Sequence, residues 1–356
     1  GGVNSWVLDK LKRVAETQVL DLTMDAEMEL SGERRSVNVT VMPLISVEQK
    51  KLGSMIMIED ISSEKRMKST MSRYMDPSIA DQLLLGGAEI LGGKSVTATV
   101  LFSDIRGFTT LTEELGPHAT VSMLNEYFEI MVECIQKEGG MLDKFIGDAI
   151  MAAFGIPMGH DDDEDRAVRA SVAMMRSLTA WNVTRVNEAK KPVNIGIGLN
   201  TDTVVSGNIG SKKRMDFTII GDGVNLAARL ESACKQYYAR ILISEFTFKK
   251  LRGTYRSREI DLVVVKGKTK PVAVYEILDY HTDETFPNLM DVVNQFKDGL
   301  AKYRHGKWDA AIASFSEALQ LNPTDKLSSI YIERCEHLKA NPPEGEWSGV
   351  WVMEEK

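Results

Sequence analysis

The chain has 356 residues, of which 43% are hydrophobic and 26% are charged. This composition is typical of a globular protein with two or three domains, and it excludes a chain that is mostly disordered. Because 51 acidic residues outnumber 43 Lys and Arg residues, the net charge is −8, and we expect no nucleic-acid partner.

The chain begins with Gly1 and Gly2, and helix-like sequence follows at once without a signal peptide. We therefore expect a further segment upstream, a sensor domain of the full-length protein that could attach it to a membrane. No apolar run approaches the ~20 residues that cross a bilayer, and Cys134, Cys234 and Cys335 show no metal-ligand or disulfide spacing. These features predict a cytoplasmic chain with no membrane segment of its own.

Residues 1–62 contain two strand-like stretches. The first, 36–41, alternates apolar and polar residues, and the second, 55–58, is an apolar run. Two strands do not form a stable sheet alone, so we interpret this region as the end of a larger sheet domain. Its pattern resembles the last strands of a PAS sensor domain.

Residues 63–93 form a polar, helix-prone connector. Its apolar residues Met67, Met71, Tyr74 and Met75 recur at spacings of three and four, which predicts a helix with one apolar stripe. Two interpretations remain open: a helix packed on its own domain, or a parallel coiled segment between two subunits that transmits a signal.

Residues 94–280 alternate strand-like and helix-like segments, which favours an α+β domain on a mostly antiparallel sheet. Strands are expected at 96–102, 141–146, 149–154, 193–199, 204–209, 217–220, 241–243, 262–265 and 272–278. Helices are expected at 119–137, 163–189, 224–235 and 245–251.

The tail, 285–340, is again helical, with helices expected at 294–303, 308–321 and 327–339. Its helix–turn–helix pattern with a terminal proline resembles one tetratricopeptide unit. A lone unit cannot form a solenoid, so we expect this tail to pack as an accessory. An irregular C-terminus is expected at 341–356.

Three segments of the central domain carry candidate chemistry. In the first, an apolar strand ends at Asp104, Gly107 permits a turn, and a helix is expected near Thr109. This arrangement offers backbone N–H groups to phosphate and a carboxylate to a divalent cation. The alternative is an aspartate that merely caps the helix or shapes the turn.

The second segment is a predicted hairpin that follows Lys144 and has Gly147 and Asp148 at its tip. A hairpin aspartate is usually only a turn residue. Two aspartates at strand edges of one domain, Asp104 and Asp148, could instead share a pair of Mg²⁺ ions, which prefer few carboxylates plus substrate phosphates.

In the third segment, a strand meets a helix through Gly221-Asp222-Gly223, and Asn225 and Arg229 follow on one helical face. This pair could be a solvated face. As a functional pair, the asparagine would orient a substrate oxygen and the arginine would neutralise charge on a phosphate.

Together these segments resemble the catalytic domain of class III adenylyl cyclases, of the bacterial and cyanobacterial type that reads the purine with lysine and threonine. The resemblance covers roughly 94–280. It implies a ferredoxin-like fold and conversion of ATP to 3′,5′-cyclic AMP and pyrophosphate, by in-line attack of the ribose 3′-oxygen on the α-phosphorus. Two Mg²⁺ or Mn²⁺ ions would serve each active site.

The resemblance also implies a role for each matching residue. It implies that Asp104, Asp148 and the Ile105 carbonyl bind metal, that Lys144 and Thr218 bind the purine, that Asn225 and Arg229 are catalytic, and that Gly107, Phe108, Thr109 and Lys266 bind phosphates.

In this family, residues as close as Lys144 and Asp148 serve two different active sites, so the resemblance implies that activity requires a homodimer. Many members carry aspartate where Thr218 stands, yet Lys144 can donate to adenine N1, which favours ATP. The alternatives are a guanylyl cyclase, a catalytically silent nucleotide-binding module, and a helical interaction protein whose tail and connector carry the function.

Overall fold

The structure is a computed structural model that describes residues 4–47, 50–71, 93–211, 214–263, 271–343, Trp347 and Gly349. The chain divides into two units, Gly1–Gly86 and Gly87–Lys356, which are considered separately. The connector beyond Met71, Lys266 with its flanking residues and most of the expected irregular C-terminus lie outside the described residues.

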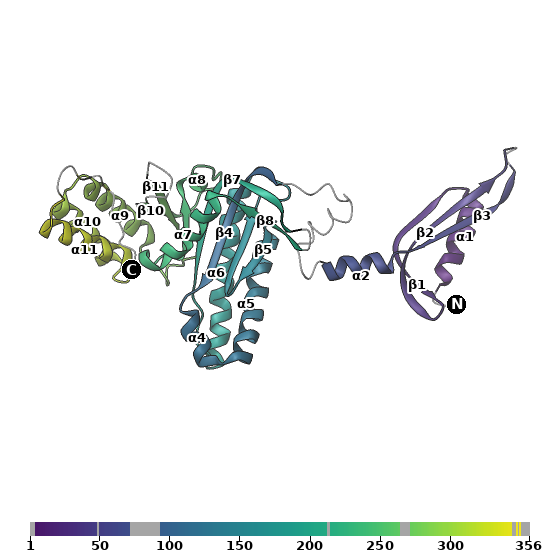
Figure 1. Ribbon diagram of the computed structural model, residues 1–356, viewed down its shortest axis with the longest axis horizontal. Helices are drawn as coiled ribbons and strands as arrows, with labels where there is room; N and C mark the ends of the chain where they lie inside the picture. The colour runs from purple at the N-terminus through teal and green to yellow at the C-terminus, as the bar shows by residue number, and fades with distance from the viewer. Residues whose placement is uncertain are drawn as a thin grey trace. The chain divides into compact units, whose positions relative to one another are not determined.

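The first unit is a small antiparallel sheet with one helix packed on it (Figure 1). Its three strands are ordered β1-β2-β3. The expected strands lie within β2 and β3, and the helix-like sequence after Gly2 forms α1, whereas the first strand was not predicted. The elements are α1 (Ser5–Thr17), β1 (Asp21–Leu30), β2 (Glu33–Ile45), β3 (Lys51–Asp60) and α2 (Ser62–Met71).

Alternation of side chains explains this packing. Val37, Val39 and Val41 of β2 are fully buried and form one core with Val7 and Val14 of α1. The period of two along β2 places these three valines on the same face of the sheet, so the helix covers that face.

The second unit is built on an eight-stranded sheet ordered β10-β11-β9-β7-β4-β6-β5, with β8 paired to β7. Neighbouring strands are antiparallel except β7 and β9, so the expected α+β class with a mostly antiparallel sheet is confirmed. The strands are β4 (Lys94–Ile105), β5 (Met141–Ile146), β6 (Ala149–Phe154), β7 (Ile195–Ser211), β8 (Arg214–Ile220), β9 (Ile241–Ser244), β10 (Ser257–Val263) and β11 (Val272–Ile277).

Helices cover both faces of this sheet (Figure 1). On one face, Ile197 and Leu199 of β7 are buried in a core shared with α5 and α6. Gly198, between them, points to the other face, where an added Cβ would lie 2.3 Å from the Ala227 carbonyl oxygen of α7. Glycine therefore allows α7 to approach the sheet closely. The helices are α4 (Phe108–Leu115), α5 (Pro117–Lys137), α6 (Asp163–Asn187), α7 (Asp222–Tyr237) and α8 (Glu245–Phe248).

The helical tail shares a core with the sheet domain. Its helices are α9 (Leu289–Arg304), α10 (Trp308–Leu321) and α11 (Lys326–Ala340). Phe296 and Tyr331 of the tail lie in one buried cluster with Leu230 of α7. The buried Arg258 of β10 also contacts Glu276 at 2.8 Å and Asp325 of the tail at 2.9 Å. Apolar contacts with α7 and an ion pair with β10 therefore hold the tail against the sheet domain.

Within the described part of the chain, none of the helices combines the length and apolar character that spanning a bilayer requires.

Candidate active site

The loop from β4 to α4 contains the first candidate aspartate. Asp104 stands near the end of β4, opposite Gly196 of β7. Gly107 follows with φ of 67°, in the left-handed region that favours glycine, and α4 starts at Phe108. Within the described chain no side chain caps this helix, so the N–H groups of its first turn are available to an anion.

The hairpin between β5 and β6 brings the second aspartate beside the first. Because Ser103 of β4 pairs with Ile150 of β6, the start of β6 lies next to the end of β4. Burial and the adjacent Asp104 carboxylate raise the pKa of Asp148 to about 6. Its Oδ2 atom is buried and has no hydrogen-bond partner within the described chain. Two facing carboxylates with an unpaired buried oxygen fit a divalent cation.

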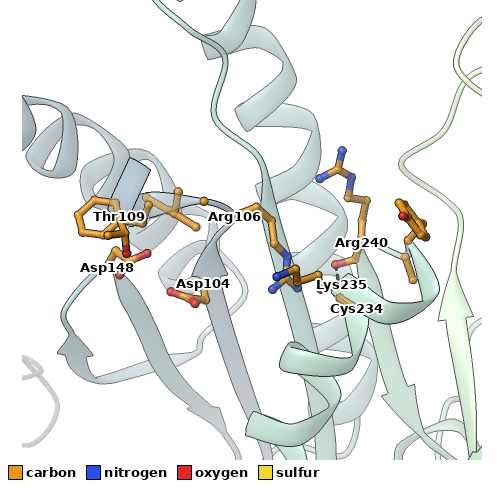
Figure 2. A pocket seen from close by; sticks show the side chains of 12 residues that line it. Asp104, Arg106, Thr109, Asp148, Cys234, Lys235 and Arg240 are labelled. Atoms are coloured by element: carbon orange, nitrogen blue, oxygen red, sulfur yellow. Dashed lines mark hydrogen bonds between the residues drawn. The ribbon is translucent and has the colours of Figure 1, made fainter. Parts of the chain in front are cut away.

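Both aspartates open into a cavity of about 580 Å³. Figure 2 shows Asp104 and Asp148 at one end of the cavity and Lys235 and Arg240 at the other, with Arg106 between them. The cavity therefore has an acidic end suited to metal and a basic end suited to anions. The loop residues Gly107, Phe108 and Thr109 also line it.

A second group of candidates meets on β5 and β8. The Thr218 hydroxyl donates to Asp143 Oδ2 at 3.0 Å, and Lys144 Nζ lies 3.4 Å from the same oxygen. The predicted purine pair is thus brought together through a residue that the sequence analysis did not single out. Burial raises the pKa of Asp143, and the neighbouring Lys144 and Thr218 oppose that rise.

Residues 93–279 match the family described as the adenylate and guanylate cyclase catalytic domain. The chain belongs to this family. The match begins just before β4 and ends after β11, so the cyclase domain contains the eight strands described for the second unit together with α4 to α8.

The cyclase domain also has named relatives. The chain is 34% identical over 287 residues to a terminal-differentiation-specific adenylate cyclase of Dictyostelium discoideum, across 78% of this chain and 13% of the relative. It is 39% identical over 186 residues to an adenylate cyclase of Anabaena cylindrica, across 50% of this chain and 36% of the relative. The chain therefore spans well under half the length of these two relatives.

Among solved structures, a bacterial light-regulated adenylyl cyclase is 27% identical, with a TM-score of 0.55 over 66% of this chain and 68% of that one. This likeness agrees with the α+β cyclase fold described above.

Asn225 and Arg229 of the cyclase domain are both exposed on α7. Neither belongs to the described lining of the cavity that contains Asp104, and the same is true of Lys144 and Thr218. Within one chain, the structure therefore brings together the two aspartates, and separately the purine pair, without uniting the two groups. Lys266 lies outside the described residues.

Arg106, which lines the cavity, and Glu231, which forms an ion pair with Arg106, were not singled out by the sequence analysis. Arg106 lies in the loop from β4 to α4, between Asp104 and Gly107, and Glu231 lies on α7 two residues beyond Arg229. Burial raises the pKa of Glu231 to about 7, although Arg106 lowers it. The only sequence signal was the position of these charged residues beside residues already singled out.

Proposed function

We propose that this chain is an adenylyl cyclase that converts ATP to 3′,5′-cyclic AMP and pyrophosphate at sites shared across a homodimer. The observation that carries the proposal is the pairing of Asp104 with Asp148, whose buried Oδ2 has no hydrogen-bond partner within the described residues. Bound divalent cations stabilise such a pair of carboxylates by offsetting their repulsion. The proposed nucleotidyl transfer requires these cations. The names of the relatives, which are adenylate cyclases, favour ATP as the nucleotide.

Asp104, Asp148 and the Ile105 carbonyl would hold two Mg²⁺ or Mn²⁺ ions in each site. When bound, the ions supply positive charge that lowers the pKa of the ribose 3′-hydroxyl and neutralises the reacting phosphate.

The remaining residues bind and position ATP. The N–H groups of Gly107, Phe108 and Thr109 bind triphosphate oxygens, and Lys266 holds the terminal phosphates. Asn225 orients the ribose and Arg229 neutralises charge on the phosphate as the 3′-oxygen attacks the α-phosphorus in line. Lys144 and Thr218 bind the adenine.

The separation of these groups supports the proposed homodimer. The described lining of the Asp104 cavity contains none of Lys144, Thr218, Asn225 and Arg229. In the proposed dimer, one subunit supplies Asp104 and Asp148, and its partner supplies the purine pair, the α7 pair and Lys266. Each chain then contributes half of two sites.

We further propose that the flanking regions regulate this cytoplasmic enzyme in signal transduction. Residues 1–62 are assigned as the end of a PAS-like sensor, 63–93 as the signalling helix, 94–280 as the catalytic domain, 285–340 as a TPR-like accessory and 341–356 as an irregular end. An upstream sensor segment would complete the first unit. The tail shares a core with α7, the helix that carries Asn225 and Arg229. This contact supports regulation of the catalytic residues by the tail.

The test is turnover of ATP by the purified chain with Mg²⁺ or Mn²⁺, followed across a range of protein concentrations. We expect cyclic AMP, with specific activity that rises with concentration as dimers form. Replacing Arg229 by alanine should raise the activation free energy of cyclic AMP formation by roughly 2–4 kcal/mol. Nucleotide binding without any cyclic product would leave only a silent module, and preferred turnover of GTP would establish a guanylyl cyclase.

A further inference from the structure

Asp143 occupies an unusual place between the two purine-binding candidates. Its side chain has 0% exposure, whereas that of Lys144 is 39% exposed. One oxygen, Oδ2, accepts the Thr218 hydroxyl at 3.0 Å and lies 3.4 Å from Lys144 Nζ. The other, Oδ1, is buried and has no hydrogen-bond partner within the described chain. A buried carboxylate in this position carries a desolvation cost that packing alone would not require.

A β-bulge explains how two consecutive residues reach the same neighbour. Leu142 pairs with Ala152 and Lys144 pairs with Met151, so Asp143 is the extra residue on β5. In a regular strand Asp143 and Lys144 would point to opposite faces. A bulge breaks this alternation and redirects side chains, and bulges are frequent beside functional sites. Here it brings both charged groups toward Thr218 of β8.

The hydrogen bond between Thr218 and Asp143 determines what the threonine can offer a ligand. A hydroxyl has one hydrogen and two lone pairs, so alone it can act as donor or acceptor. Because its hydrogen is given to the Asp143 carboxylate, only lone pairs remain for a base. Lys144, in contrast, has only hydrogens to donate. The pair therefore presents one donor and one acceptor.

That pattern is complementary to adenine and not to guanine. Adenine offers an acceptor at N1 and a donor at its N6 amino group, whereas guanine offers an N1–H donor and an O6 acceptor. Guanine would place a donor against Lys144 and an acceptor against the Thr218 lone pairs. A site with polar groups fixed in this way rejects the wrong partner because those groups are left unpaired.

We propose that Asp143 is a specificity-determining positioning residue, which fixes the Thr218 hydroxyl as an acceptor and steadies Lys144 so that the site selects adenine over guanine nucleotides. This inference rests on the proposed function, because it assigns the base preference of that same site.

The test compares ATP with GTP in Asp143→Asn. The amide can donate to Thr218 and so free its hydrogen to point at the base. We expect the ratio of kcat/KM for ATP over GTP to fall about tenfold or more, mainly through a higher KM for ATP. Asp165→Asn is the matched control, since Asp165 is also buried and accepts three hydrogen bonds, from Arg252, Gly253 and Tyr255. It should leave the ratio unchanged.

A double-mutant cycle separates this role from general packing. If Asp143 acts through Thr218, then Asp143→Asn added to Thr218→Val should change the base preference little beyond Thr218→Val alone. An unchanged ratio in folded Asp143→Asn would overturn the inference. If Asp143→Asn does not fold, an unchanged ATP preference in Thr218→Val would overturn it equally, because the hydroxyl would then select no base.

Equilibrium dialysis of ATP and GTP, without turnover, keeps this test apart from the test of the proposed function. If the wild-type chain binds ATP but forms no cyclic product, the cyclase proposal fails while the binding ratio still reports on Asp143. If the wild-type chain forms cyclic AMP and the ratio is insensitive to Asp143, only the present inference fails.

Discussion

Arg106 joins the loop after β4 to helix α7 through Glu231. Its Nη2 atom donates to the Glu231 carbonyl oxygen at 2.8 Å, and its Nη1 atom lies 3.0 Å from Glu231 Oε1. Space for this contact comes from Gly196, where a Cβ would lie 1.7 Å from Arg106 Nη2. The contact fixes the loop that follows Asp104 against the helix that carries Asn225 and Arg229.

We expect Arg106→Met to destabilise the cyclase domain by about 2 kcal/mol, because it leaves the buried Glu231 without its cation and one carbonyl without its donor. Urea denaturation measures this loss. Arg252→Ala is the control, since its ion pair with Asp161 is 3.9 Å long and both side chains are exposed. If the two substitutions lowered the free energy of unfolding equally, the contact between Arg106 and Glu231 would stabilise the domain no more than an exposed ion pair does.

Glu231 should make stability depend on pH. Its pKa is raised to about 7 from 4.5, chiefly by burial, so the folded state binds this proton more tightly than the unfolded chain does. The stabilisation is fully present below pH 4.5 and is lost as pH rises to about 7, by up to about 3 kcal/mol. Glu231→Gln should flatten the unfolding free energy over this range. A variant with the same pH slope as the wild-type chain would contradict the assignment.

The paired aspartates should respond to divalent cations in a stability assay as well as in turnover. We expect Mg²⁺ or Mn²⁺ to raise the melting temperature of the wild-type chain, because a bound cation offsets both the burial of Asp148 and its repulsion from Asp104, which together raise its pKa. Asp148→Asn should lose this shift, remain folded and form no product. In metal-free buffer above pH 6 it should melt at or above the wild-type temperature, since one buried charge is gone.

Asp161→Asn is the matched control for that experiment. The Asp161 side chain is 95% exposed and lies outside the described lining of the cavity. It should retain the cation-dependent shift. Loss of the shift in both variants would assign the effect to general screening of the acidic chain.

Local patterns predicted the elements that position the candidate site. The sequence predicted both the apolar strand that ends at Asp104 and the turn at Gly147, because apolar strand patterns and glycine turns are local signals. The strand β1 also alternates, at Leu22, Met24 and Met28, and reading that signal would have found it.

Two features could not be predicted in the same way. The role of Asp143 depends on a bulge between Leu142 and Lys144, and regular alternation would place its side chain on the wrong face. The contact between Arg106 and Glu231 joins residues 125 positions apart. It requires the pairing of β4 with β7 and the space at Gly196, neither of which a local pattern encodes.

Subunit mixing tests whether the two groups of residues meet across a dimer. Asp104→Ala and Arg229→Ala should each be inactive or nearly so alone. In a mixed dimer, one site combines both defects and the other combines the intact Arg229 of one chain with the intact Asp104 of the other. Equal mixing should therefore restore about a quarter of wild-type activity, because about half of the dimers are mixed and each has one working site.

The control mixes Asp104→Ala with Asp148→Ala, which both damage the metal-binding half of a site. Every site in that mixture carries one lesion or the other, so cyclic AMP formation should stay absent. Native mass spectrometry of differently tagged chains verifies that mixed dimers form. If they form and the first mixture remains as inactive as the second, then Asp104 and Arg229 do not act from opposite subunits, and the catalytic site must be assembled within one chain.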